Sequence, residues 1–316
     1  MPPLVTDYSR NYPHSLHHVD EKIQSLLSLY SSEAAKGAIY QMTSGGKRIR
    51  AYLSLSCSQL LGLDYEYAVT CAAISELLHN ASLVHDDIQD RSDTRRDLPS
   101  IWKKYGSDIA ICSGDLLISA AFASAAMAPS RHTSEIIKHM HSCISETICG
   151  QSADLSTRYN KRVTEGDYLE IVSQKTAPLL SLPIELAFIY AGESKFLSSI
   201  RTCIVAYSTA YQVYDDIKDA DIDHNEGNLN LVNIYSRELS SISALEQAAL
   251  LAKESLVKFN ILTEHIPFGC GNILKQLPGN TETTKFSSVV KISEPRKGEY
   301  KNIFPYNDVV TRSNHV

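Results

Sequence analysis

Long runs of apolar residues at helical spacing constrain this chain more than any other feature. Residues 49–61, 67–84, 107–127 and 135–152 carry apolar side chains that recur every three or four positions, among many Ala, Leu, Ile and Ser residues. That spacing places the apolar side chains on one face of an α-helix. Alternating β-branched segments bounded by turns, which would predict strands, are hard to find. The sequence therefore predicts an all-α protein.

Small residues inside these runs predict that the helices approach one another closely. Examples are "CAAISELLHNASL" (71–83) and "SAAFASAAMA" (119–128). Hydrophobic residues make up 43% of the 316 residues, enough to bury a sizeable core. We expect one large helical bundle around a central cavity over residues 1–278. Residues 279–316 are polar and lack a helical stripe, which predicts an irregular tail.

Composition excludes several classes of protein. The net charge of −6 argues against a general nucleic-acid binder. Seven cysteines without a C-x-x-C pair argue against a disulfide scaffold or zinc ribbon, and favour a reducing compartment such as the cytoplasm. The first 20 residues show no basic-then-apolar signal peptide, and no run of 18 apolar residues occurs, so we expect no membrane span.

Two aspartate clusters follow apolar helical runs, in "LVHDDIQD" (83–90) and "YQVYDDIKD" (211–219). They contain Asp86, Asp87 and Asp90, and Asp215, Asp216 and Asp219. The outer carboxylates of each cluster are four residues apart, on one face of a helix, where like charges repel. Oxygen ligands on one face suit Mg²⁺, which also binds phosphate oxygens. Two facing clusters would hold a metal–diphosphate group; solvated acidic helix ends are the alternative.

Basic residues near these clusters predict binding of a second anion. They are Lys47 and Arg50 in "SGGKRIR", Arg95 and Arg96 in "TRR", and Lys175, beside Thr176, in "QKTAPL". The glycines before the first pair open a helix, whose N-terminus favours anions, although the spacing is not that of a Walker A loop. Guanidinium groups bind diphosphate oxygens in pairs. For any one of these pairs, ordinary surface charge is the alternative.

The order of the motifs resembles the all-trans prenyl (polyprenyl) diphosphate synthase family. The matching stretches are "GGKRIR" (45–50), "ELLHNASLVHDDIQDRSDTRR" (76–96), "GSDIAICSGDLLISAAF" (106–122), "GQSADL" (150–155), "KTAPL" (175–179) and "YQVYDDIKD" (211–219). The resemblance implies the isoprenoid synthase type I fold, usually as a homodimer. It also implies Mg²⁺-dependent head-to-tail condensation of isopentenyl diphosphate (IPP) with an allylic diphosphate.

The resemblance further implies roles for particular residues, carried over position by position. The two clusters would bind three Mg²⁺ ions through Asp86, Asp87, Asp90, Asp215, Asp216 and Asp219. Arg95 would contact the allylic diphosphate. The IPP diphosphate would be bound by Lys47, Arg50, His79 and Arg96. The allylic group and its carbocation would be contacted by Lys175, Thr176 and Gln212.

Three departures from the family pattern leave the reaction open. Asn228 stands where a lysine is usual, Val232 where a proline is usual, and Asp97 where a glycine is usual. "GNLNLV" (227–232) also resembles the metal-binding region of class I terpene cyclases. The alternatives are therefore a cyclase or other prenyltransferase that ionises a diphosphate without IPP, or a non-catalytic subunit of a heteromeric synthase. The full set of IPP-site residues favours the synthase over the cyclase, and the six retained aspartates argue against the subunit.

Small residues upstream of the first aspartate cluster predict a long product. One helical turn rises about 5.4 Å, close to the length of an isoprene unit. One turn before Asp86 the chain carries Ser82 and Ala81, where short-chain family members carry aromatic residues. Leu78 lies a further turn back, and Phe122 is a candidate stopper on a facing helix. We predict geranylgeranyl diphosphate (C20) as the main product; tight helix packing is the alternative reason for the small residues.

Overall fold

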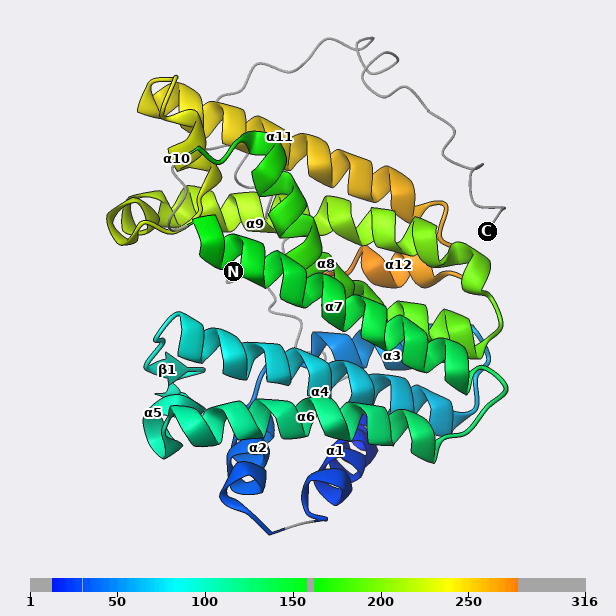
Figure 1. Ribbon diagram of the computed structural model, residues 1–316. Coiled ribbons are helices and arrows are strands. Elements are labelled where there is room, and N and C mark those ends of the chain that lie inside the picture. Colours follow the sequence, from blue (N-terminus) through cyan, green and yellow to red (C-terminus); the bar gives the residue numbers. More distant parts are fainter. Residues whose placement is uncertain (1–12, 30, 158–161, 278–316) are drawn as a thin grey trace, which may run out of the picture.

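A computed structural model describes residues 13–29, 31–157 and 162–277, and the predicted tail at 279–316 lies outside these ranges. The described chain is helical apart from one small hairpin (Figure 1), which confirms the all-α prediction. The helices are α1 (Pro13–Leu27), α2 (Glu33–Thr43), α3 (Ile49–Leu60), α4 (Tyr65–Gln89), α5 (Ile101–Tyr105), α6 (Ser107–Met127), α7 (Thr133–Thr157), α8 (Glu165–Tyr190), α9 (Leu197–Glu226), α10 (Leu231–Tyr235), α11 (Ser241–Thr263) and α12 (Cys270–Leu274). The hairpin consists of β1 (Thr94–Arg95) and β2 (Leu98–Pro99).

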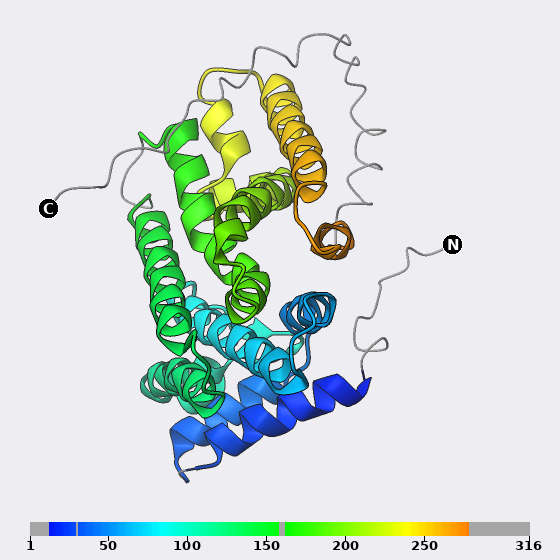
Figure 2. The same cartoon turned by 90° about the vertical axis from the view of Figure 1, so that its right-hand side faces the viewer.

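The long helices lie alongside one another, and α1 and α2 cross beneath them at a steep angle (Figures 1 and 2). Helix α4 packs against α3, α6 and α8, while α8 also packs against α7 and α9. Fully buried alanines on the α4–α6 contact include Ala72, Ala73 and Ala121. Their small side chains permit the close helix approach that the sequence indicates.

The two helices that carry the aspartate clusters end on the same side of the bundle. Helices α4 and α9 both finish at the left of Figure 1, close to β1 and α10. Helix α9 ends at Gly227, whose φ of 74° is the left-handed conformation that terminates many helices. Helix α8 begins with a capping box between Thr164 and Asp167 and contains Pro178 in its interior. The backbone thus brings segments far apart in sequence to one end of the fold.

One helix of the described chain, α6, is long and apolar enough to cross a membrane by length and composition. In the bundle it packs against α2, α4 and α5, and 44% of its most apolar window is buried. A core helix of a globular domain passes the same test, so a single such helix is weak support for a membrane span. The expectation of no membrane span stays a prediction.

Candidate active site

A strongly acidic cavity of about 730 Å³ lies between the ends of α4, α8 and α9. Its lining carries seven carboxylates: Asp90, Asp154, Asp215, Asp216, Asp219, Asp223 and Glu226. Among the residues that the structure describes, two cationic side chains, Arg95 and Lys175, line the same space. Such an excess of oxygen ligands fits divalent cations, which would neutralise the carboxylates and attract phosphate oxygens.

A second cavity of about 580 Å³ lies beside the first, between α3, α4, α7 and α8. Its residues include Arg50, His79 and Asp86, together with apolar side chains such as Leu155 and Leu179. Lys175 and Thr176 line both cavities, so the two spaces meet at these residues. The arrangement offers one acidic compartment, one basic and apolar compartment, and a shared wall between them.

In the first aspartate cluster, the three carboxylates have different surroundings. Asp87 is buried and accepts hydrogen bonds from Arg95, with Nε 3.0 Å from Oδ1 and Nη2 also in contact. Asp86 is half-buried and faces the second cavity, whereas Asp90 is exposed and faces the acidic one. Burial raises the pKa of Asp86 to about 6, while Lys175 opposes that rise. Asp87 therefore anchors an arginine, whereas Asp86 and Asp90 face the two cavities.

The second cluster has the same burial pattern with different partners. Asp216 is buried; it accepts hydrogen bonds from Gln212 Nε2 at 3.0 Å and from the Leu231 backbone N–H at 2.8 Å. Burial raises the pKa of Asp216 to about 6 despite these donors. Asp215 forms an ion pair with Lys218 on the outer side, 3.0 Å apart, and Asp219 is exposed toward the cavity.

The loop between α9 and α10 is held by amide side chains. Asn228 Nδ2 donates to Asp223 Oδ1 at 3.2 Å, and Asn230 Nδ2 donates to Asp223 Oδ2 and to the Asp216 carbonyl, each at 2.8 Å. Asn230 also caps the N-terminus of α10 through its side-chain oxygen. Sequence reasoning missed Asp223 and Asn230. The signal was available, because Asp223 continues the four-residue spacing of Asp215 and Asp219.

The hairpin positions the two arginines through an unusual turn. Arg96 and Asp97 connect β1 to β2, with φ values of 55° and 63°. A two-residue hairpin turn with two positive φ angles favours glycine or asparagine. For other residues the left-handed conformation costs about 1–2 kcal/mol of conformational free energy each. The Arg96 guanidinium bonds the Gly45 carbonyl and the Ser44 hydroxyl. The turn explains why a glycine would suit position 97.

The predicted IPP-site cations gather around His79. Burial and then the charges of Arg50, Arg96 and Arg95 hold the pKa of His79 well below its usual range. Arg50 donates through Nε to the Leu179 carbonyl, 3.1 Å away, and a Cβ at Gly46 would collide with the Arg96 guanidinium. The hydrogen bonds described for Arg50 and Arg96 go to neutral oxygens. Because these hydrogen bonds supply no negative charge, the two guanidinium groups remain able to attract an anion. Lys47, by contrast, is exposed.

Lys175 and Thr176, which line both cavities, are held in place by a close contact between α7 and α8. A Cβ on Gly150 would lie 2.4 Å from the Lys175 backbone nitrogen, so only glycine permits this approach. Lys175 Nζ donates to Asp154 Oδ2 at 2.6 Å. The structure thus brings Lys175, Thr176 and Gln212 to the acidic cavity, and their contact with an allylic group stays a prediction.

The four residues predicted to set product length occupy different places. Ser82 lines the second cavity and donates to the His79 carbonyl at 2.8 Å. Ala81 and Leu78 are buried in the α4 core, and Phe122 is half-buried against it. None of these three is among the residues that line the cavities described. Gln151, which sequence reasoning did not single out, lines the second cavity and donates to Gln89.

The helical bundle with two facing aspartate clusters defines an isoprenoid-synthase type of fold. Comparison with known proteins gives the family: a model described as "Polyprenyl synthetase" matches residues 32–233. The chain is 33% identical over 211 residues to a geranylgeranyl diphosphate synthase of Methanosarcina mazei, covering 64% of each protein. It is 32% identical over 228 residues to that of Sulfolobus acidocaldarius, covering 69% of this chain and 68% of the relative. The chain belongs to the polyprenyl synthetase family.

Solved structures have the same fold over most of the chain. The geranylgeranyl pyrophosphate synthetase of Geoglobus acetivorans superposes with a TM-score of 0.70 at 25% identity, covering 86% of this chain and 96% of that one. A polyprenyl synthase of Caulobacter crescentus superposes with a TM-score of 0.73 at 20% identity, covering 84% and 94%. These likenesses confirm the predicted fold.

Proposed function

We propose that this protein catalyses Mg²⁺-dependent head-to-tail condensation of IPP with an allylic diphosphate, giving an all-trans prenyl diphosphate of C20 length. One observation carries the proposal: an acidic cavity and a basic cavity meet at Lys175 and Thr176. A reaction between two diphosphates needs two such anion sites side by side. Relatives named geranylgeranyl diphosphate synthase support the reaction class.

The acidic cavity would take the allylic diphosphate. Asp90 from the end of α4, and Asp215 and Asp219 from α9, line this cavity, and Asp86 lines the neighbouring one. These four carboxylates would hold divalent ions; three ions follow only from the family resemblance. Bound Mg²⁺ would stabilise the negative charge of the departing diphosphate. Arg95, held by Asp87, adds a fixed cation at the same place.

The basic cavity would take IPP. Arg50 and Arg96 surround His79, whose lowered pKa keeps the imidazole neutral and able to donate one hydrogen bond. Exposed Lys47 would complete the binding of the diphosphate. Thr176 and Gln212 would lie against the allylic group, and apolar Leu179 would keep water from the cation.

The direct test is a product assay. The protein is incubated with Mg²⁺ and geranyl or farnesyl diphosphate, with and without IPP, and the products are identified. A C20 diphosphate formed only with IPP supports the proposal. A hydrocarbon formed without IPP would instead support the terpene cyclase. That alternative rests on the α9–α10 loop, in which Asn228 and Asn230 bind Asp223 and asparagine replaces the usual lysine at position 228.

Ser82 offers a test of product length. A phenylalanine at a position that lines the cavity should shorten the product toward C15 while activity persists. Ala81→Phe is the matched control: Ala81 is buried in the core, so the added volume should destabilise the fold by about 1–3 kcal/mol. An active Ser82→Phe enzyme with an unchanged product would contradict the C20 gate.

We also propose that the protein is a cytoplasmic homodimer. Exposed isoleucines lie on the adjacent helices α6 and α7: Ile111, Ile137 and Ile148 are 47%, 37% and 59% exposed. A second copy would cover this apolar surface. All seven cysteines are free thiols, as a reducing compartment permits. Light scattering should give twice the 35.0 kDa chain mass.

A further inference from the structure

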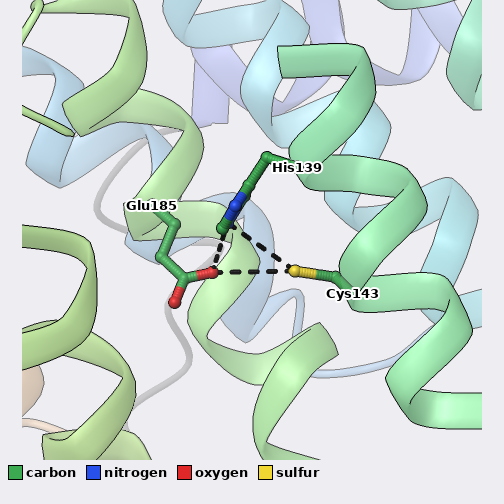
Figure 3. Close-up of side chains that lie close together, drawn as sticks. All are labelled: His139, Cys143 and Glu185. Atoms are coloured by element: carbon green, nitrogen blue, oxygen red, sulfur yellow. Dashed lines mark hydrogen bonds and ion pairs between the residues drawn. The ribbon is translucent and has the colours of Figure 1, made fainter. Parts of the chain in front are cut away.

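A cluster of three ligand-type side chains lies in α7 and α8, outside both cavities. His139 and Cys143 are one turn apart on α7, and Glu185 faces them from α8 (Figure 3). His139 Nε2 lies 2.7 Å from Glu185 Oε2, and Cys143 Sγ lies 3.6 Å from Nε2 and 3.8 Å from Oε2. Three different ligand types therefore converge on one point.

These separations can be compared with those of a tetrahedral zinc site. Zinc bonds of about 2.0–2.3 Å place neighbouring ligand atoms about 3.3–3.6 Å apart. The two sulfur distances, 3.6 and 3.8 Å, are close to this range. The nitrogen–oxygen distance of 2.7 Å is that of a hydrogen bond, and it would open by about 0.6 Å when an ion replaced the bridging proton.

The cluster already holds a positive charge. Arg201 Nη2 lies 3.0 Å from both Cys143 Sγ and Glu185 Oε2, and its Nε donates to Glu185 Oε1. Glu185 is only 1% exposed, so its carboxylate requires a cation. Arg201 also forms an ion pair with Glu146, which is 46% exposed and is an alternative partner for the guanidinium group.

We propose that His139, Cys143 and Glu185 form a second metal site, selective for zinc, for which Arg201 is a built-in competitor. Thiolate and imidazole ligands prefer zinc over magnesium, in contrast to the all-oxygen clusters of the acidic cavity. On binding, the Cys143 thiol releases its proton to solvent, zinc bonds to the thiolate, and Arg201 turns to Glu146. Water would fill the fourth position.

The site would tie α7 to α8 one helical turn from Thr147, which lines the second cavity and donates to the Cys143 carbonyl. Zinc binds the thiolate form of cysteine, so the Cys143 thiol loses its proton when the ion binds. His139 is 18% exposed and gives the ion a route from solvent.

Cobalt is the probe that tests the site, because thiolate–cobalt bonding produces a near-ultraviolet charge-transfer band. The full-length protein is titrated with Co²⁺ in excess Mg²⁺, which occupies the carboxylate clusters. No described residue that lines either cavity is a cysteine, so the band excludes cobalt bound only at the carboxylate clusters. We expect one Co²⁺ per chain with a thiolate band, displaced by Zn²⁺. Absence of the band in the unmodified protein would overturn the proposal without any variant.

Matched variants locate the site. Cys143→Ser should abolish the band and weaken binding about 100-fold, whereas Cys149→Ser, at an exposed position on the same helix, should leave both unchanged. Persistence of the band in Cys143→Ser would also overturn the proposal. Arg201→Met removes the competing cation and should tighten Co²⁺ binding about tenfold or more. Unchanged or weaker binding would overturn the role of Arg201 as a competitor.

Discussion

The middle carboxylate of each aspartate cluster is buried, yet Asp87 and Asp216 have different kinds of partner. Asp87 pairs with the charged Arg95, whereas Asp216 accepts from the neutral Gln212 amide and the Leu231 backbone. In both clusters the flanking carboxylates are more exposed and face the cavities. One motif therefore has two structural roles: outer carboxylates that face the cavities, and a middle anchor that differs between the clusters. The first anchor fixes a cation, and the second fixes the α9–α10 loop.

The largest expected effect comes from the outer ligands. Asp86→Ala or Asp215→Ala should lower turnover by about 10²-fold or more, because the departing diphosphate would lose counter-ions. The thermal midpoint should change little, since both side chains are only half-buried. Steady-state kinetics and thermal unfolding measure the two effects. Full activity in excess chelator would contradict the metal role of both clusters.

Replacing the two anchoring carboxylates should change the free energy of unfolding by different amounts. Asp87→Asn leaves Arg95 without its carboxylate and should lower the free energy of unfolding by about 1–3 kcal/mol. This is less than the loss expected for a fully buried ion pair, because Arg95 is 32% exposed and water screens its charge. Asp216→Asn should change the free energy of unfolding by less than about 1 kcal/mol at pH 7. The carboxylate has only neutral donors, and its raised pKa means that its charge opposes folding above pH 6. Urea unfolding without divalent ions compares the two; equal losses would remove the distinction between the anchors.

A cation placed in the second cluster should make it resemble the first. Asn228→Lys would bring an ammonium group beside Asp223 and Glu226, which now bind the Asn228 amide. A hydrogen bond to a charged group is worth about 1.5–3 kcal/mol, so the Michaelis constant for the allylic diphosphate should fall about tenfold. Asn228→Gln keeps the amide and serves as the control. A neutral or harmful lysine would favour the cyclase alternative.

The smallest effect is a dependence of metal binding on pH. Because burial raises the pKa of Asp86 to about 6, the carboxyl takes up a proton as the pH falls through 6 and then competes with Mg²⁺. The half-saturating Mg²⁺ concentration should rise about twofold at pH 6 and about fourfold at pH 5.5 relative to pH 7.5. Asp216→Asn should retain this rise if Asp86 is the titrating ligand. Loss of the rise in that variant would assign it to Asp216 instead.

Much of this protein follows from its sequence, because helical periodicity and i, i+4 carboxylates act locally. The expected helix at 107–127 is α6, residue for residue, and the expected helix at 67–84 lies within α4. The spacing alone places Asp86 and Asp90, and Asp215 and Asp219, on single helix faces. The ordered motifs were sufficient to indicate the family.

Tertiary structure decided which carboxylates face the cavities and which are buried anchors. No local pattern distinguishes Asp87 from Asp86, because the difference depends on a hairpin that returns Arg95 to α4. Packing also joins residues that are distant in sequence. Lys175, where the two cavities meet, bonds Asp154, 21 residues away, and Glu185 contacts His139, 46 residues away. Spacing along a helix fixes which face a side chain occupies, but only packing between helices determines its partner and its distance from water.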